Sequence, residues 1–273
     1  MLQARSWLPR TEGSVRLEFA RRGERTALRV LHQAGAARVR FPSPAADAPP
    51  EAVLLNTAGG LTGGDRIDIA VTLGAGAEAT LTTATAEKIY RARDGEAEVG
   101  VKLALAAGAR LTWLPQPTIL FDRSRLNRRT EATLSGDASL LAIETLIFGR
   151  AAMGEDVLRG TCRDAWRVRR DGALVFADAF RVDGAIADVL HRPATLDGAR
   201  AVAMLLYVAR DAAGRIDKAR ALLESADMTA GASAWNGLLL VRAMARDGRV
   251  LLQGIAPLAQ WLSGRPLPRV WQC

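Results

Sequence analysis

The chain has 273 residues, of which 49% are apolar, so it can fold around a core and does not have the composition of a disordered protein. It carries 37 basic and 29 acidic residues, a formal net charge of +8, and only three of the basic residues are lysines. This charge favours an acidic partner, either a nucleic acid or an acidic protein surface, and a solvated arginine-rich surface explains it equally well. With only two cysteines, a disulfide framework is excluded.

The first two-thirds of the sequence has the patterns of β-strands. Short apolar or alternating runs predict strands at 15–19, 26–33, 37–41 and 67–73, with a Pro-rich loop at 42–50. A recurring unit follows, in which one strand enters a glycine turn and another leaves it, with turn glycines at Gly76, Gly108, Gly136 and Gly172. Their spacings of 32, 28 and 36 residues are too variable for a regular solenoid and predict stacked hairpins in layered sheets.

The character of the sequence changes at about residue 194. The patterns predict buried strands at 201–209 and 234–245, an amphipathic helix at 214–227, and a helix at 250–266 that Pro257 kinks or divides. No linker precedes this part, so we predict a single domain over 1–273, in which 1–193 is β-rich and 194–273 is a mixed α/β tail packed on it. The predicted fold class is mainly β, with stacked sheets of repeated hairpins and a few helices, mostly toward the C-terminus.

Four glycines gather in NTAGGLTGGDR, residues 56–66. Gly59 and Gly64 have the spacing of a phosphate-binding loop, but Asp65 stands where that motif needs a lysine, and a strand follows instead of a helix. The run GAGAEA at 74–79 likewise lacks the helix of a dinucleotide site and predicts a hairpin turn. A turn explains one or two glycines at 56–66, whereas four indicate that another backbone segment approaches closely.

The sequence shows no catalytic apparatus and no permanent metal site. His32, His191, Cys162 and Cys273 are far apart, and no G-x-S-x-G motif occurs. Numerous carboxylates leave a β-repeat carbohydrate-active enzyme open as an alternative. Arginines in a predicted loop at 121–131 leave a basic β-rich nucleic-acid-binding protein open as another, although an acidic protein partner fits better because aromatic residues are only 5% of the chain. These observations favour a binding or scaffolding role.

The first residues, MLQARSWLPR, lack the apolar core of a signal peptide. The longest apolar run, at 201–209, is too short to cross a bilayer. We therefore expect a cytoplasmic protein that does not bind a membrane.

Several stretches, in the same order along the chain, resemble the urease accessory protein family UreD, called UreH in some organisms. They are LLNTAGGLTGGDRIDIAVTLGAGAEATLTTATAEKIYRA (54–92), LTWLPQPTILFDRSR (111–125), LLAIETLIFGRAAMGE (140–155), the opening VRLEFARRGERTAL and the closing GRPLPRVW. The sequence departs from the family pattern at Thr57-Ala58, where many members carry prolines, and at Pro117, where the usual residue is Glu.

The resemblance implies a mostly β, non-enzymatic scaffold for urease maturation. Members of the family bind the accessory protein UreF, recruit the nickel-carrying GTPase UreG through it, and dock on apo-urease. The resemblance therefore implies a UreF-like protein, a UreG-like GTPase and apo-urease as partners, and no nucleic acid. It also implies nickel in transit through an internal passage and no permanently bound cofactor.

The resemblance also selects two groups of candidate residues. Polar candidates for the passage or an interface are Thr82, Thr83, Glu87, Glu144 and Glu155, which as ordinary strand residues would instead face solvent or pair with Arg91 and Arg150. The matching motif contributes Gly59, Gly60, Gly63, Gly64, Asp65, Lys88, Tyr90, Arg91, Gly149 and Arg150. In this interpretation the glycine loop allows close packing at a partner surface or passage wall and does not bind phosphate. Oxygen ligands in a hydrated channel suit a cation that must be released.

Overall fold

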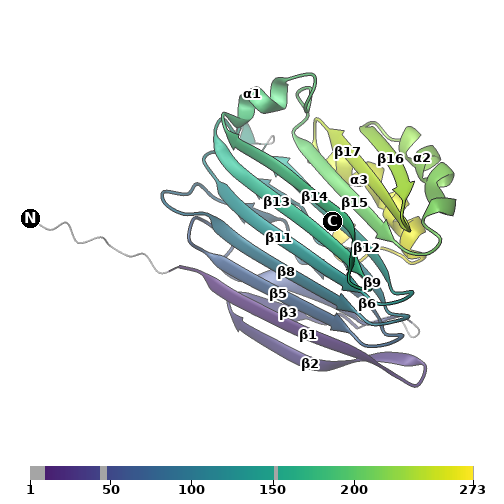
Figure 1. Ribbon diagram of the computed structural model, residues 1–273. Helices are drawn as coiled ribbons and strands as arrows, with labels where there is room; N and C mark the ends of the chain where they lie inside the picture. The colour runs from purple at the N-terminus through teal and green to yellow at the C-terminus, as the bar shows by residue number, and fades with distance from the viewer. Residues whose placement is uncertain (1–9, 44–47, 151–152, 273) are drawn as a thin grey trace, which may run out of the picture.

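The computed structural model describes residues 10–43, 48–150 and 153–272, and its strands form two sheets stacked face to face (Figure 1). The first sheet contains, in spatial order, β14 (Ala173–Gly184), β13 (Gly160–Arg170), β11 (Arg125–Leu134), β8 (Ala97–Leu105), β5 (Arg66–Leu73), β1 (Glu12–Arg22) and β2 (Arg25–Gly35). The second contains β16 (Thr229–Trp235), β17 (Leu238–Ala245), β15 (Ala201–Val208), β12 (Ser139–Phe148), β9 (Arg110–Leu114), β6 (Glu78–Thr83), β4 (Glu51–Asn56) and β3 (Ala37–Arg40).

The helices are α1 (Ile186–His191), α2 (Ile216–Glu224) and α3 (Gly248–Ser263), with short 3-10 turns at Ala213–Arg215 and Arg269–Trp271. The predicted fold class, mainly β with stacked sheets and a few helices mostly toward the C-terminus, is confirmed. In the part of the chain that the structure describes, no helix is both long and apolar enough to cross a membrane.

The chain coils from one sheet to the other. After β5 in the first sheet come β6 in the second and the short strand β7 (Glu87–Ile89), and β8 then returns to the first sheet. The next turn of the coil repeats this path with β9, β10 (Thr118–Leu120) and β11. Strands one turn apart pair in parallel, as β5 does with β8 and β6 with β9. β7 pairs with β10, and β10 pairs with the end of β12, so both short strands belong to the second sheet beside its main row of strands.

The prediction of repeated hairpins is wrong at three of the four glycine turns. At Gly76, Gly108 and Gly136 the chain crosses from the first sheet to the second, and the two flanking strands pair with other strands. The run GAGAEA at 74–79 is therefore a crossing turn. Gly172 does close a hairpin, between β13 and β14. A local turn sequence specifies the bend, whereas the partner of each strand depends on contacts with residues one coil away.

Most other predicted elements agree with the structure. Strands occupy most of 15–19, 26–33, 37–41, 67–73 and 201–209, and helices occupy most of 214–227 and 250–266, with Pro257 inside an undivided α3. The strand predicted at 234–245 is wrong in part, because Asn236 and Gly237 form the turn between β16 and β17 with positive φ angles of 48° and 73°. Of the predicted Pro-rich loop, residues 44–47 lie outside the described residues, as do residues 1–9 and Cys273.

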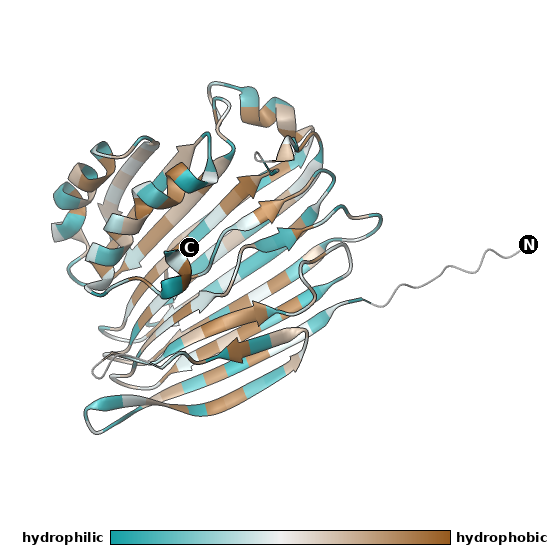
Figure 2. Cartoon of the chain, turned by 180° about the vertical axis from the view of Figure 1, so that it is seen from behind, coloured by the Kyte–Doolittle hydropathy of each residue, from teal (hydrophilic) through white to brown (hydrophobic). Residues whose placement is uncertain are grey.

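Two hydrophobic cores share the second sheet. Between the sheets, alternate residues such as Leu17 of β1 and Leu140 of β12 are buried. On the outer face, α2 and α3 cover the second sheet (Figure 2), and Ile143 of β12 lies in the same core as Leu251. β12 is thus buried on both faces, and Glu144 occupies a position on the inner one. A carboxylate in such surroundings requires a partner, because burying an unpaired charge in a protein interior costs on the order of several kcal/mol.

Candidate functional site

A buried guanidinium connects the two sheets. Arg128 of β11 donates a hydrogen bond from Nε to Oδ1 of Asp164 at 3.0 Å and another from Nη2 to Oδ2 at 2.6 Å. Its Nη1 donates to Oγ1 of Thr118 at 2.9 Å and lies 2.6 Å from Oε1 of Glu144. These charged side chains are between 5% and 7% exposed. We call Arg128, Glu144 and Asp164 the buried ion cluster.

One cation in the buried ion cluster faces two carboxyl groups. Burial would lower the pKa of Arg128, but Asp164 and Glu144 raise it above its ordinary value, so the guanidinium stays charged. Burial raises the pKa of Glu144 to about 8, with Arg128 opposing the rise and Asp164 adding to it. Burial and the charge of Asp164 likewise raise the pKa of Cys162 to about 12. Burial therefore favours the protonated form of Glu144, and the guanidinium of Arg128 favours the charged form.

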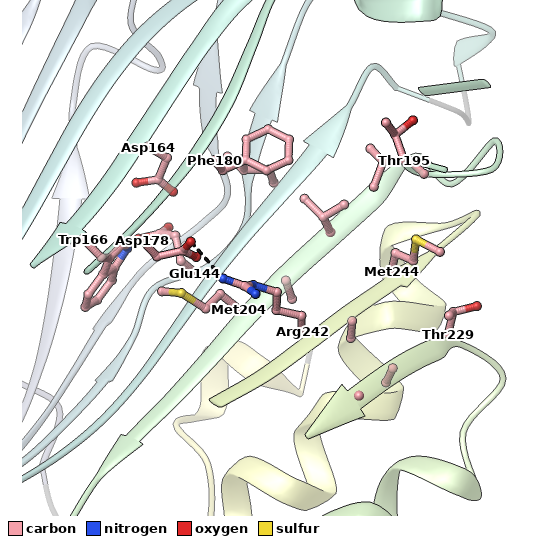
Figure 3. Close-up of a pocket in the computed structure, with 17 residues that line it drawn as sticks. Glu144, Asp164, Trp166, Asp178, Phe180, Thr195, Met204, Thr229, Arg242 and Met244 are labelled. Atoms are coloured by element: carbon pink, nitrogen blue, oxygen red, sulfur yellow. Dashed lines mark ion pairs between the residues drawn. The ribbon is translucent and has the colours of Figure 1, made fainter. Parts of the chain in front are cut away.

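A groove of about 460 Å³ lies beside the buried ion cluster, between β13 and β14 of the first sheet and β15 and β17 of the second (Figure 3). Glu144 and Asp164 contribute to its wall, and Asp178 lines it while pairing with Arg242 at 2.8 Å. The Arg242 side chain is 62% exposed, so the groove reaches the surface. The rest of the lining is mostly apolar and includes Leu146, Trp166, Phe180, Val202 and Met204.

A second cavity, of about 200 Å³, has Glu87 in its wall. Nδ2 of Asn56 donates to both carboxylate oxygens of Glu87 at 3.2 Å. Burial raises the pKa of Glu87, and the Asn56 hydrogen bonds and the Arg128 charge oppose that rise. Glu87 of β7 pairs with Thr118 of β10, which pairs with Leu146 of β12. Because paired residues on parallel strands point to the same face, Thr118 stands between the second cavity and the groove.

The chemistry of these walls suits brief contact with a cation. Carboxylate oxygens are the ligands that hard divalent cations prefer, and they also bind nickel. Within the described residues, no group of three or more His, Cys, Asp and Glu side chains is placed to hold a metal ion. Among the described residues, Nε1 of the buried Trp166 has no hydrogen-bond partner. Oε1 of Glu144 has no hydrogen-bond partner there either, but it forms an ion pair with Arg128. In this structure, carboxyl groups in the two walls are held by Asn56 and by Arg128.

The glycine loop is closely packed, as its sequence indicates. A Cβ atom on Gly60 would overlap the ring of Tyr90, and one on Gly63 would overlap the backbone oxygen of Asp94 in the next coil. Asp65 is buried and serves the same loop, because its carboxylate accepts hydrogen bonds from the backbone N–H groups of Thr11 and Thr62, each at 2.8 Å. The loop is therefore held by the Asp65 side chain, a carboxylate where a phosphate site would need a cation. Gly59 and Gly64 complete it with φ angles of 78° and 88°.

The other motif residues lie in loops and short strands at the same end of the coil. The Tyr90 ring packs on Phe121 with centroids 4.8 Å apart, and the Arg150 guanidinium lies 4.6 Å from the centroid of Phe121. Arg150 also pairs with Glu155 at 2.6 Å. Glu155 is therefore a carboxylate paired with an arginine, which is the alternative to a passage residue that the sequence left open. The structure brings these residues together with the glycine loop and with Lys88, Arg91 and Gly149.

The polar candidates divide by their surroundings. Glu87 and Thr83 line the second cavity, and Glu144 lines the groove. The hydroxyl of Thr82 is buried and donates to the backbone oxygen of Leu114 at 2.6 Å, so it serves the strand end.

Sequence reasoning missed two members of the buried ion cluster. The sequence predicts a loop at 121–131 that contains Arg128, and this prediction is wrong, because most of the segment is β11 and Arg128 faces the interior. Asp164 was not singled out at all. An alternating pattern in β13 could have revealed it, since Cys162, Asp164 and Trp166 occupy successive inward positions and the carboxylate is the polar one among them.

Comparison with known proteins covers almost the whole chain. Residues 11–272 match the family model described as UreD urease accessory protein. A urease accessory protein UreD from Xanthobacter autotrophicus is 49% identical over 262 residues, which cover 96% of this chain and 90% of the relative. A protein of the same description from Methylobacterium sp. is 47% identical over 269 residues (96% and 95%), and one from Azorhizobium caulinodans is 46% identical over 263 residues (96% of both chains).

Proposed function

Because the chain belongs to the UreD urease accessory protein family and takes part in urease maturation, we propose that it is a non-enzymatic scaffold that helps deliver nickel to the urease active site. In this proposal it docks on apo-urease, binds a UreF-like partner, and receives nickel from a UreG-like GTPase through that partner. Nickel is the cargo, no cofactor is bound permanently, and neither nucleic acid nor a membrane takes part. The protein acts in the cytoplasm.

The placement of interior carboxylates is the observation that supports transit of nickel through this chain. Glu87 lines one cavity, Glu144 and Asp164 line the other, and Thr118 stands between them. Carboxylates buried in a hydrophobic core are costly, and such groups are concentrated at functional sites. Separate carboxylates bind a cation weakly enough to pass it on, which a closed cage of ligands does not.

The two alternative functions have less support. A nucleic-acid interface would use the arginines of 121–131, but Arg128 is buried and paired with Asp164. A glycosidase needs two carboxyl groups on either side of a sugar, whereas Arg128 fills the space between Glu144 and Asp164.

The test is co-expression of urease subunits, a UreF-like protein and a UreG-like GTPase in nickel-supplemented cells, with and without this chain. We expect urease activity and nickel content to depend on the chain, and the purified chain alone to be inactive. Glu144→Gln and Glu87→Gln should each lower the nickel content of urease while the complex still assembles. Glu131→Gln, which changes an exposed carboxylate of β11, is the matched control. Urease that matures equally well without the chain would refute the proposal.

A further inference from the structure

The Arg128 guanidinium contacts residues that stand between the two cavities and in the wall of the groove. It extends from β11 of the first sheet to Thr118 and Glu144, which stand on the opposite side of the interior. Thr118 is the direct neighbour of Glu87 on one side and of Leu146, a groove residue, on the other. Neighbouring strands in a sheet are about 4.8 Å apart, so Glu87 and Leu146 are separated by about two strand spacings with Thr118 between them. An ion that passes Thr118 meets the guanidinium.

The guanidinium is a strong obstacle to a divalent cation. It stays charged at any pH that proteins tolerate, and inside a protein its repulsion is only weakly screened. It also occupies the oxygens that a cation would use, because three of its nitrogens contact Asp164, Thr118 and Glu144. While these contacts last, the carboxyl groups of Asp164 and Glu144 are held by Arg128 and are not available as metal ligands.

The contacts of Arg128 differ in how easily they separate. Arg128 and Asp164 are register partners on β11 and β13, and they share two hydrogen bonds within the first sheet. Glu144 belongs to β12 of the second sheet and makes a single contact with Nη1. A displacement of one sheet relative to the other therefore breaks the contacts of Nη1 with Glu144 and Thr118 first and leaves Arg128 on Asp164.

We propose that Arg128 is the gate of the interior passage: the connection is closed to divalent cations while Arg128 holds Glu144, and it opens when the guanidinium releases Glu144 and stays on Asp164. This inference rests on the proposed function, since a gate has meaning only if nickel moves through the chain. With the gate closed, the isolated chain binds divalent cations weakly. Nickel passes only when one sheet is displaced relative to the other and the gate opens.

The experiment uses the full chain co-purified with its UreF-like partner. Ni²⁺ alone, and Zn²⁺ alone, are titrated into the complex by calorimetry. Arg128→Met should raise the affinity for both ions by about tenfold or more, because a buried positive charge is lost and two carboxyl groups become free. Arg128→Lys, which keeps the charge but loses the planar fork, should raise it by about threefold. Arg129→Met, on the exposed face of the same strand, should bind as the wild type does.

A second measurement follows urease activation in cells with nickel and increasing zinc. The Arg128 variants should be inhibited at lower zinc concentrations than the wild type or Arg129→Met. Circular dichroism and recovery of the partner in the purified complex establish that each variant is folded, and Arg128→Lys decides the question if Arg128→Met does not fold. Folded Arg128 variants with wild-type metal affinity and wild-type zinc sensitivity would overturn the gate. Failure of the proposed function would appear instead in the wild type, as urease activation that does not need the chain.

Discussion

Arg128 and Asp164 face each other as register partners on parallel strands β11 and β13 and are joined by two hydrogen bonds of 3.0 and 2.6 Å. The pair is buried, with side chains only 7% and 6% exposed, so little water can reach either charge to replace its partner.

Asp164→Ala should therefore lower the free energy of unfolding by about 3–5 kcal/mol, because it leaves the guanidinium with a single carboxyl group that must give up its proton. Urea unfolding followed by circular dichroism measures this change. Asp68→Ala removes the exposed pair with Arg66 and should cost no more than about 1 kcal/mol. Equal costs for the two variants would contradict the buried ion cluster as described.

Glu144→Gln should change how stability depends on pH. The pKa of Glu144 rises on folding from its ordinary value of 4.5 to about 8, so the folded state keeps a proton that the unfolded state loses. Stability contributed at this position therefore falls as pH increases from 4.5 to about 8, and is constant outside that range. The variant lacks this dependence, so its stability relative to the wild type should increase between pH 5 and pH 8. Parallel stability curves for the two proteins would show that Glu144 does not keep its proton.

Cys162 should not react with thiol reagents in the folded protein. It is fully buried, and its pKa is raised to about 12, so almost no thiolate exists at pH 8. In a Cys273→Ser background, Ellman's reagent should detect no thiol under native conditions and one thiol in denaturant. Fast labelling of the native protein would mean that the interior around Asp164 is open to solvent.

Gly63→Ala should destabilise the protein by more than about 2 kcal/mol, because the new methyl group meets a backbone oxygen that cannot move aside. Gly59→Ala meets no atom within 4 Å but has a φ of 78°, so it should cost about 1–2 kcal/mol from backbone strain alone. Gly214→Ala has neither problem and should be close to neutral. Thermal unfolding of the three variants tests this order.

The strands could be predicted from the sequence because alternation is a local signal, which β1 shows in Val15, Leu17 and Phe19. Their pairing could not, because the turn at Gly76 bends the chain equally well for a hairpin and for a crossing between sheets. The Asn236-Gly237 pair is typical of a two-residue hairpin turn, but it lies next to a long apolar run, which favours a single continuous strand at 234–245.

For the candidate site, the motif around Gly60 and Tyr90 could be recognised because its residues are close in sequence. The buried ion cluster joins residues from three strands, and nothing local marks Arg128 as buried among its exposed arginine neighbours. Glu144 was selected through the family resemblance, and its partner could be found only from the fold.

The parallel coil also has a consequence for how such a chain can change in length. Each turn adds one strand to each sheet and places its residues in line with those of the turn before, as in the row Ile67, Val99, Arg128 and Asp164. A duplicated or deleted whole turn would keep every remaining row aligned, whereas a change of one residue within a strand would move inward side chains outward. The architecture is therefore modular in units of about thirty residues, and insertions of other sizes belong in its loops.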